Sequence, residues 1–580
     1  MQSPDKTLFT YWRHWTALLV LTCLLCFSGL GKFPVIDRDE ARFAQASVQM
    51  AESGDLINIR FQDEARNKKP AGIYWLQTGA IKAFGATGQR AIWIQRLPSV
   101  LGALLAVLIS YWGAARMIGR KGAFIAAAML SISALMIFEA HIAKTDAVLC
   151  GLSASCFAAL AHLRHNQNPG KFKLPSWVFW IALGLSIMIK GPVLPLLVIL
   201  TLITLAIWER RNVWMKQFLN WPAIILFFLI WLPWAITIWI ATDGAFFADS
   251  LGKDFGGKII SAQEKHSGLP GYYLGTIWIT FWPSCLLLIP GFAFAFRAVK
   301  NKKNSDAPVI KAMRLCLAWI LPYWVLVEIM PTKLPHYVLP LFPALTVITA
   351  AAAITLISVR EFKIIRRVNA LIYLIISTGI VGGIMAATTY FDGVNYVFYT
   401  IGTLSGVAAI VATFALWRNK MTLGLLSAGL STIFLTIPAY QFILPNISQF
   451  RIADQVKIAF EEQNIKLPRH GGPSLVSPDF TEPSLVYHFG KEVDVSGKSD
   501  LLDIDALKQG RIIILDRLKN KAGPKLDMIK IQAQEQGLCL KTSAPIKGFN
   551  YSKGNSVELT ISRSIPCPEN GIITNEQPVE

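Results

Sequence analysis

The sequence predicts a mostly α-helical protein that crosses a membrane many times. Its 580 residues are 53% hydrophobic and only 16% charged, whereas soluble domains contain about 25% charged residues. Uncharged runs recur, as at 15–31, 98–114 and 368–387, and each approaches the roughly 20 residues that a helix needs to cross a bilayer core. A large soluble all-α protein is disfavoured, because its buried helices rarely stay apolar over such lengths.

The hydropathy profile of the chain predicts about thirteen transmembrane helices. They are expected near 15–31, 97–115, 122–139, 147–162, 176–189, 192–208, 221–241, 274–296, 314–329, 336–358, 368–389, 398–416 and 421–443. An odd number of spans would place the two ends of the chain on opposite sides of the membrane. The first span lacks a small-residue cleavage site on its flank, so we expect a retained anchor rather than a removable signal peptide.

The basic residues predict the orientation of these spans. The net charge of +20 could suggest a nucleic-acid partner, but Lys and Arg gather in every second connection, as at 116–121 and 360–367. The positive-inside rule places such connections in the cytoplasm. We therefore expect a cytoplasmic N-terminus, an exported C-terminal tail, membrane lipids as surroundings and no nucleic-acid partner.

Three segments lie outside on this topology: the loops 32–96 and 242–273 and the tail 445–580. Strand-like segments at 474–477, 493–495, 511–515 and 556–562 alternate in the tail with helix-like segments at 482–489 and 526–536. The sequence thus divides into a membrane domain, 1–444, and a small α/β domain, 445–580. We interpret the latter as a lid or docking module without chemistry of its own.

The tail also contains Cys539 and Cys567. An oxidising compartment would permit a disulfide between them, but two cysteines in one domain need not lie close together. Both alternatives stay open. The other six cysteines lie in or beside predicted spans, where a thiol is most simply a small apolar side chain.

Ionisable residues at membrane depth are costly, so each is a candidate functional residue. In this topology the candidates gather on the outer side: Asp37, Asp39, Glu40, Arg42, Lys68, Lys69, Glu139, His141, Lys144, Asp146, Lys190, His266 and Lys333. Scattered positions would indicate separate structural ion pairs. A one-sided set favours a single site.

These residue types suggest chemistry on an anionic substrate. The cationic candidates, which could neutralise a phosphate, are Arg42, Lys68, Lys69, Lys190, Lys333 and His266. The acids Asp39, Glu40 and Asp146 could act as a general base or hold an amino group or a metal. Tyr337 could stack on a sugar or a prenyl chain. Taken singly, each charge could instead be an interfacial ion pair or anchor, and each aromatic part of an interfacial belt.

Several segments carry a family resemblance. They are 39–44 (Asp-Glu-Ala-Arg-Phe-Ala), 50–55 (Met-Ala-Glu-Ser-Gly-Asp), 69–75 (Lys-Pro-Ala-Gly-Ile-Tyr-Trp), 145–146 (Thr-Asp), 190–192 (Lys-Gly-Pro), His266 followed by Tyr272-Tyr273, and 333–343, which begins Lys-Leu-Pro-His-Tyr. In this order they resemble the outer loops of bacterial aminoarabinose transferases. They also resemble the wider dolichyl-phosphate-mannose-type glycosyltransferases (families 39 and 83), which share the GT-C fold.

The resemblance implies a bacterial inner-membrane enzyme whose donor is a sugar on undecaprenyl phosphate. The acceptor would be a periplasmic lipid or glycan, which is lipid A for the aminoarabinose transferases. Asp39 aligns with the acidic catalytic residue, Arg42 with its neighbouring arginine and Lys69 with the lysine that binds carrier phosphate. The remaining polar positions align with Asp146, Lys190, His266 and Tyr337. Some relatives use a divalent metal, but no ligand set is evident in this sequence.

One position departs from the family pattern. Aminoarabinose transferases carry Glu before the Lys-Pro pair, whereas this chain has Lys68 before Lys69. A carboxylate could bind a cationic amino sugar, and an ammonium group would repel it. A neutral or acidic donor sugar is therefore an alternative to aminoarabinose.

Three functions remain as hypotheses. The first is an inverting glycosyltransferase acting on lipopolysaccharide, on another envelope glycan or on protein. The second is a flippase or exporter of a lipid-linked sugar. It is disfavoured because transporters place polar groups near the bilayer midplane and often contain inverted repeats. The third is a non-catalytic scaffold, which would give no reason for the grouping of Asp39 with Lys69.

Overall fold

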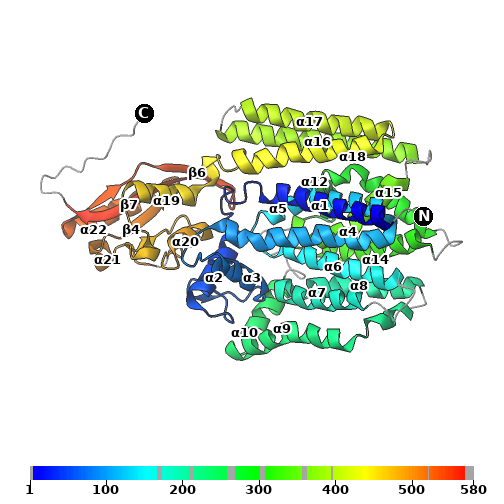
Figure 1. The fold of residues 1–580 in the computed structure, drawn as a ribbon. Coiled ribbons are helices and arrows are strands. Elements are labelled where there is room, and N and C mark those ends of the chain that lie inside the picture. Colours follow the sequence, from blue (N-terminus) through cyan, green and yellow to red (C-terminus); the bar gives the residue numbers. More distant parts are fainter. Residues whose placement is uncertain are drawn as a thin grey trace.

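The computed structural model describes residues 4–165, 173–209, 213–257, 268–300, 307–355, 362–392, 396–497, 499–519 and 522–567. Most of these residues are helical. The long helices run side by side in a bundle, and a smaller region that contains a β-sheet lies at one end of it (Figure 1). The helices of the first loop, α2 and α3, lie at that same end.

Eight helical segments in the described part of the chain are long and apolar enough to cross a membrane, and a bent pair raises the number to nine. The eight correspond to α4 (Ile92–Ser131), α6 (Asp146–His165), α9 (Trp221–Ala241), α14 (Pro308–Ile329), η4 with α15 (Pro335–Thr355), α16 (Lys363–Asp392), α17 (Tyr396–Trp417) and α18 with η7 (Met421–Ile443). The bent pair joins α12 (Tyr272–Thr280) to the segment Ser284–Lys300 at 114°; that segment comprises η3 (Ser284–Leu287) and α13 (Leu288–Lys300).

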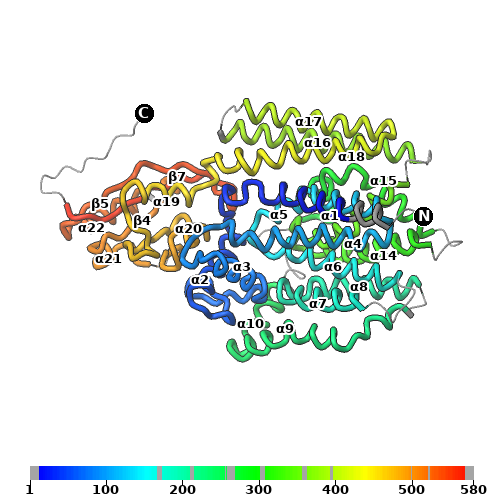
Figure 2. Tube along the Cα trace, in the orientation of Figure 1, coloured from blue at the N-terminus to red at the C-terminus, as the bar shows by residue number. Residues whose placement is uncertain are grey.

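Three further apolar helices are shorter. They belong to α1 (Pro4–Phe27), α7 (Leu174–Lys190) and α8 (Val193–Glu209). Helix α1 packs against α4, and the two traces run alongside each other (Figure 2). The coarse prediction of a mostly helical, multi-pass membrane protein is therefore confirmed.

Helix α4 reverses its direction at Gly119. This residue has φ 76° and ψ 168°, which no α-helix contains. A straight helix of 40 residues would be about 60 Å long. However, the Ser99 hydroxyl near its start donates to the carbonyl of Ile142, beyond its end, at 2.6 Å. The chain must therefore fold back, and the turn separates the segments predicted at 97–115 and 122–139. The short helix α5 (Ala134–Ala140) follows.

The first loop folds into two helices and a two-stranded hairpin. Helix α2 (Asp39–Ser53) packs on α3 (Gly72–Ala83), and β1 (Arg60–Phe61) pairs antiparallel with β2 (Glu64–Ala65). The rings of Phe43 and Tyr74 lie 5.3 Å apart at the contact between the helices. Gly54 ends α2 with φ 76°, a conformation that glycine adopts without strain.

The C-terminal region contains five strands. Strands β3 (Leu475–Val476), β4 (Ile512–Asp516), β7 (Asn555–Pro566) and β5 (Leu538–Thr542) pair in this order, and β6 (Ile546–Asn550) also pairs with β7. Only β3 and β4 are parallel. The helices are α19 (Ile452–Glu462), α20 (Pro483–Phe489), α21 (Ile504–Lys508) and α22 (Ala522–Glu535).

Alternation along β4 explains its central position. Ile512 and Ile514 contribute to one hydrophobic cluster, whereas Ile513 and Leu515 contribute to another. Successive side chains of a strand point to opposite faces, so β4 is buried on both sides. Of the strands predicted in the tail, only 493–495 is not a strand, since Asp494 forms a single bridge to Val476.

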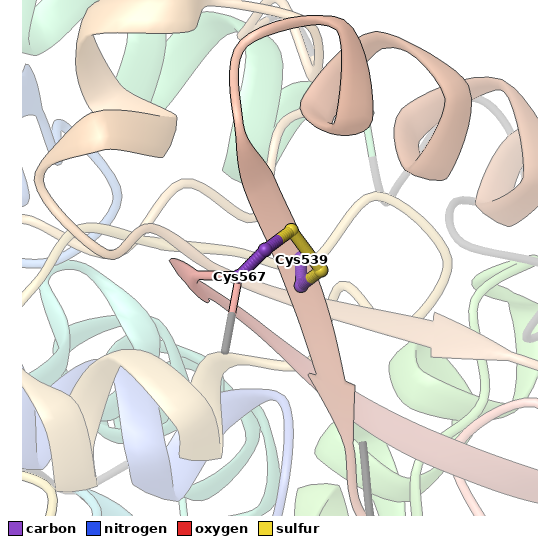
Figure 3. Close-up of a disulfide and its surroundings, with 2 residues drawn as sticks. All are labelled: Cys539 and Cys567. Atoms are coloured by element: carbon purple, nitrogen blue, oxygen red, sulfur yellow. A yellow bond between two sulfur atoms is a disulfide. The ribbon is translucent and has the colours of Figure 1, made fainter. Parts of the chain in front are cut away.

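A disulfide joins Cys539 of β5 to Cys567, which follows β7 (Figure 3). The two Cα atoms are 4.9 Å apart, a separation that the sequence could not supply. The pairing of β5 with β7 brings them together. The other six cysteines are free thiols, of which five are buried.

Candidate active site

A cavity of about 500 Å³ lies at the end of the bundle where α2 begins. Several parts of the chain contribute to its walls: the turn before α2, the segment before α3, the α5–α6 connection, the end of α7, the start of α8, η2 (Ala248–Gly256) and the segment from the end of α14 to η4 (Pro335–Leu341). Concave sites with a few converging polar groups are the usual places of ligand binding. This cavity is the candidate active site.

Asp39 is the first residue of α2, and its side chain faces the cavity. It is exposed, although the cavity that it faces is enclosed by protein on several sides. Burial raises the pKa of this carboxyl, but nearby cations, led by Lys144 and Arg66, lower it by more, so the pKa lies below its ordinary value. Asp39 is therefore an ionised acceptor at neutral pH.

A second carboxylate, Asp146, begins α6 on the wall of the same cavity. The ammonium nitrogen of Lys190 lies 2.5 Å from its Oδ1, and that of Lys144 lies 3.5 Å from its Oδ2. The imidazole Nε2 of His336 is 3.9 Å from Oδ1. Lys190 also lies 5.7 Å from the ring centre of Tyr337, within the range of a cation–π interaction.

Glu139, Asp146 and His336 could together offer three ligand atoms to a metal, since these atoms lie within 4.8 Å of one another. However, Lys144 is 3.1 Å from Glu139 and Lys190 is 2.5 Å from Asp146. The two ammonium groups already neutralise both carboxylates, so the residues present fit a divalent cation poorly. We assign no chemical step to a metal.

Lys68 and Lys69 lie just before α3, at the junction of two cavities. A second cavity of about 260 Å³ adjoins the first and is mostly apolar, with Trp231, Trp234 and Phe246 among its lining residues. The side chains of Lys68, Lys69 and Lys190 line both cavities. Three lysines therefore lie where a cavity with many charged residues on its walls meets a mostly apolar one.

Lys69 is held in place by an acid from a distant segment. Its Nζ is 2.5 Å from Oδ2 of Asp254 in the π-helical turn η2 (Ala248–Gly256). This pair is partly exposed, with 20% of the lysine and 11% of the aspartate side chain accessible. The contact keeps the ammonium group of Lys69 at the cavity wall.

Two glycines allow the helices to approach closely enough to assemble this site. A Cβ atom on Gly72 at the start of α3 would lie 2.6 Å from the carbonyl oxygen of Met188, near Lys190. A Cβ atom on Gly102 of α4 would lie 2.6 Å from the backbone of Val148, near Asp146. Larger residues at these positions would push apart the elements that carry the charged groups.

Glu40 follows Asp39 but has a different environment. Arg96 donates to its two carboxylate oxygens at 2.8 and 2.9 Å, and the amides of Ile36 and Ala143 each donate at 2.8 Å. Glu40 and Arg96 are 1% and 0% exposed. Glu40 is among the residues that line the cavity, but its carboxylate oxygens already accept these four hydrogen bonds. Its predicted catalytic role stays a prediction.

Two predicted binding residues within the described part of the chain, Arg42 and Lys333, do not line either cavity. Lys333 is buried and donates to the carbonyls of Val327 and Glu328. Arg42 lies half-buried on α2 and acts on Asp39 only through its charge. His266 lies outside the described residues. For Arg42 and Lys333 the prediction of direct substrate contact is therefore not supported.

Sequence reasoning missed several lining residues. Arg66 donates to the Tyr74 hydroxyl at 3.1 Å and lies 5.0 Å from the ring centre of Phe43. The others are Asp254, Tyr323 and His336. His336 lies inside the segment 333–343 that carried the resemblance, and Arg66 lies three residues before the segment 69–75; these positions were the available signal. Asp254 had no comparable signal.

The comparisons with known proteins agree with this geometry. Residues 11–242 match the family model described as dolichyl-phosphate-mannose-protein mannosyltransferase. A solved structure, ArnT from Cupriavidus metallidurans bound to undecaprenyl phosphate, superposes with a TM-score of 0.69 at 17% identity, covering 98% of this chain and 100% of that one. The chain has the GT-C fold.

This fold is shared with more distant enzymes. The Archaeoglobus fulgidus oligosaccharyltransferase superposes with a TM-score of 0.51 at 10% identity, covering 95% of this chain and 74% of the other. The resemblance seen in the sequence to aminoarabinose transferases and mannosyltransferases is thus confirmed.

Curated relatives from Yersinia and Pectobacterium carry the name undecaprenyl phosphate-alpha-4-amino-4-deoxy-L-arabinose arabinosyl transferase. The one from Yersinia pestis is 24% identical over 365 residues, which are 60% of this chain and 62% of that protein. The one from Pectobacterium carotovorum is 24% identical over 341 residues, 58% of each chain. The matched part spans about three-fifths of the length of these relatives.

Proposed function

We propose that this chain is an inverting glycosyltransferase that moves a sugar from a polyprenyl-phosphate carrier to a lipid or glycan acceptor. The observation that carries the proposal is the junction at Lys68, Lys69 and Lys190, where a mostly apolar cavity meets one with many charged residues on its walls. A lipid phosphate has this same division, with an apolar chain and an anionic head. The names of the relatives, which include undecaprenyl phosphate, support this choice of carrier.

The carrier phosphate would lie between Lys69 and Lys190. Charge-assisted contacts from these ammonium groups would stabilise the negative charge that develops on the leaving phosphate. The phosphate would take over the contact that Asp254 makes with Lys69 at 2.5 Å. Trp234 and Phe246 of the second cavity would contact the adjoining prenyl units.

Asp39 would act on the acceptor. An acceptor hydroxyl needs a base, and an ionised carboxylate with a lowered pKa that faces the cavity is suited to orient it and accept its proton. If the acceptor is itself a phosphate, no strong base is needed, and Asp39 would only orient it. Asp146 is held by Lys190 and Lys144, so its role would be to fix these two cations.

The membrane topology is part of the proposal. Counting α4 as two spans, together with the bent pair and the three shorter helices, gives about thirteen. We propose a cytoplasmic N-terminus in the bacterial inner membrane, a membrane domain of residues 1–444 and a periplasmic domain of residues 445–580. The Cys539–Cys567 disulfide supports this side for the C-terminal domain, because disulfides persist in oxidising compartments.

Lys68 leads us to propose a neutral or acidic donor sugar, in contrast to the amino sugar in the relatives' name. Lipid A or the lipopolysaccharide core is the proposed acceptor. The test is mass spectrometry of both fractions from cells that lack the gene and are complemented with wild type, with Asp39→Asn or with Asp63→Asn. Asp63 is the matched control, since its carboxylate lies in the same loop and is 91% exposed.

The expected result is the loss of a sugar-sized mass that wild type and Asp63→Asn restore and Asp39→Asn does not. The mass itself identifies the sugar class and so tests the role of Lys68. An unchanged lipopolysaccharide together with accumulated polyprenyl-phosphate sugar would place the acceptor elsewhere. Full restoration by Asp39→Asn would remove the role assigned to this residue.

A further inference from the structure

The C-terminal region contacts the short turn that precedes Asp39. The amide of Asp37 donates to the hydroxyl of Tyr551 at 2.5 Å, and its carboxylate accepts from the amide of Ser484 at 3.0 Å. The guanidinium of Arg38 donates to the carbonyl of Ser552. Three bonds from two places in the C-terminal region therefore converge on two consecutive residues.

The backbone of this turn is strained. Arg38 has φ 69° and ψ −106°, a combination that only glycine adopts readily. Such a conformation persists only where the surroundings over-determine it. Asp39 follows directly, so the conformation of Arg38 sets the direction in which α2 begins and in which the Asp39 carboxylate points.

The hairpin tip that contacts this turn is held in place by its own hydrogen bonds. Tyr551 and Ser552 form the tip of the β6–β7 hairpin, and Glu482 accepts from Asn550 at 2.9 Å and from the Ser552 hydroxyl at 2.7 Å. Asn550 also accepts from the amide of Ser552 at 3.1 Å. A tip fixed in this way can hold the turn before Asp39 in one position.

A second contact docks the C-terminal region independently. The hydroxyl of Tyr487 in α20 donates to Gln95 at 2.8 Å, and the carbonyl of Tyr487 accepts from Arg90 at 2.8 Å. Tyr487 is fully buried among residues of α2, α3 and the start of α4. Loss of the contact at Arg38 would therefore leave the C-terminal region docked. A mutation at Arg38 can thus change the position of the turn without undocking this region.

We propose that Arg38 and Tyr551 are positioning residues through which the C-terminal region holds the Asp39 carboxylate in its working direction. The region then takes part in turnover without touching substrate. This inference deepens the proposed function and rests on it. It assigns a task to a segment that the sequence indicated only as a lid or docking module.

The test compares Arg38→Ala, Arg38→Gly and Tyr551→Phe in the full-length protein. Glycine can adopt the backbone conformation of Arg38 without strain, whereas alanine cannot. We expect kcat for transfer to fall at least 10-fold in Arg38→Ala and less in Arg38→Gly and Tyr551→Phe. The KM for the polyprenyl-phosphate donor should stay within about 2-fold, because Lys69 and Lys190 are unchanged.

The matched controls are Arg60→Ala, an exposed arginine of the same loop, and Tyr396→Phe, an 81% exposed tyrosine. Both should behave as wild type. Thermal melting of each purified variant checks that it is folded. A variant that raises KM and leaves kcat unchanged would overturn the positioning role.

Hydrogen exchange gives a readout that needs no donor. Amides of residues 36–43 should exchange faster in Arg38→Ala and Tyr551→Phe than in wild type and the controls, while those around Gln95 stay protected. Unchanged exchange at 36–43 would overturn the inference, whatever the activity. If the wild-type protein transferred no sugar but residues 36–43 still exchanged faster in the variants, the proposed function would be contradicted. The inference that the C-terminal region holds the turn before Asp39 would still be supported.

Discussion

Two charged clusters begin at consecutive residues of α2 and differ in almost every other respect. The cluster around Glu40 and Arg96 is closed, because both side chains are fully buried and the two carboxylate oxygens accept four hydrogen bonds. The cluster around Asp39, Asp146 and the neighbouring lysines lines a cavity of about 500 Å³. Proximity in sequence therefore says little about which acid is available to a substrate.

The largest expected effect is on catalysis, from the open cluster. Asp39→Asn should lower kcat by about 10²- to 10⁴-fold, the range for loss of a general base, with little change in stability because the side chain faces the cavity. Turnover with a purified polyprenyl-phosphate donor, together with thermal melting, measures both. If Asp39→Asn instead lowered the melting temperature markedly and lost activity through unfolding, Asp39 would be a structural residue like Glu40.

The corresponding change in the closed cluster should act on stability. Glu40→Gln leaves the Arg96 guanidinium buried without its counter-charge, and breaking a buried ion pair destabilises by about 3–5 kcal/mol. We expect a lower melting temperature and a low yield of folded protein. Glu64→Gln, at an exposed position of the same loop, is the control. A stable but inactive Glu40→Gln protein would instead restore the catalytic role that the sequence suggested.

Two lysines extend the comparison to binding. Lys69→Met should raise the KM for the donor by about 10- to 100-fold, because a hydrogen bond to a charged group contributes about 1.5–3 kcal/mol. Lys333→Met should leave this KM unchanged, since Lys333 does not line the cavity and its ammonium group bonds to the carbonyls of Val327 and Glu328. Initial rates measured over a series of donor concentrations give the KM of each variant. Equal KM values would mean that Lys69 does not contact the carrier phosphate.

The smallest expected effect is a pH dependence at the docking contact. Burial raises the pKa of Asp37 to about 7, and Glu482 adds to the rise, whereas the bonds from Ser484 and the charge of Arg42 oppose it. Because the folded protein binds this proton more tightly than the unfolded chain does, the associated stability is complete at low pH. It is lost as the pH rises through about 7.

Melting curves between pH 5 and 8.5 measure this effect, which we expect to be about 1 kcal/mol after screening by solvent. The Asp37→Asn variant should lose most of the fall in stability that wild type shows as the pH rises toward about 7, and Asp63→Asn should retain it. A wild-type curve that is flat across this range would show that Asp37 titrates outside it.

The sequence by itself determined the features that depend on local patterns. Apolar runs of span length predicted most of the helices, and the short apolar run at 511–515 predicted a strand of the tail. The distribution of charges predicted that Asp39, Lys69, Asp146 and Lys190 belong together, and all four line one cavity. These signals are local because burial in a membrane or a sheet constrains neighbouring residues along the chain.

The tertiary structure alone decided how each charged side chain is used. Asp254 reaches Lys69 across 185 residues, Arg96 occupies Glu40 across 56, and Cys539 finds Cys567 only through strand pairing. A charge has no periodicity that reveals its partner, because its energy depends on which opposite charge or carbonyl the packing brings within about 4 Å. For that reason Glu40 and Asp39, identical in kind and adjacent in the chain, acquire different roles only in the folded protein.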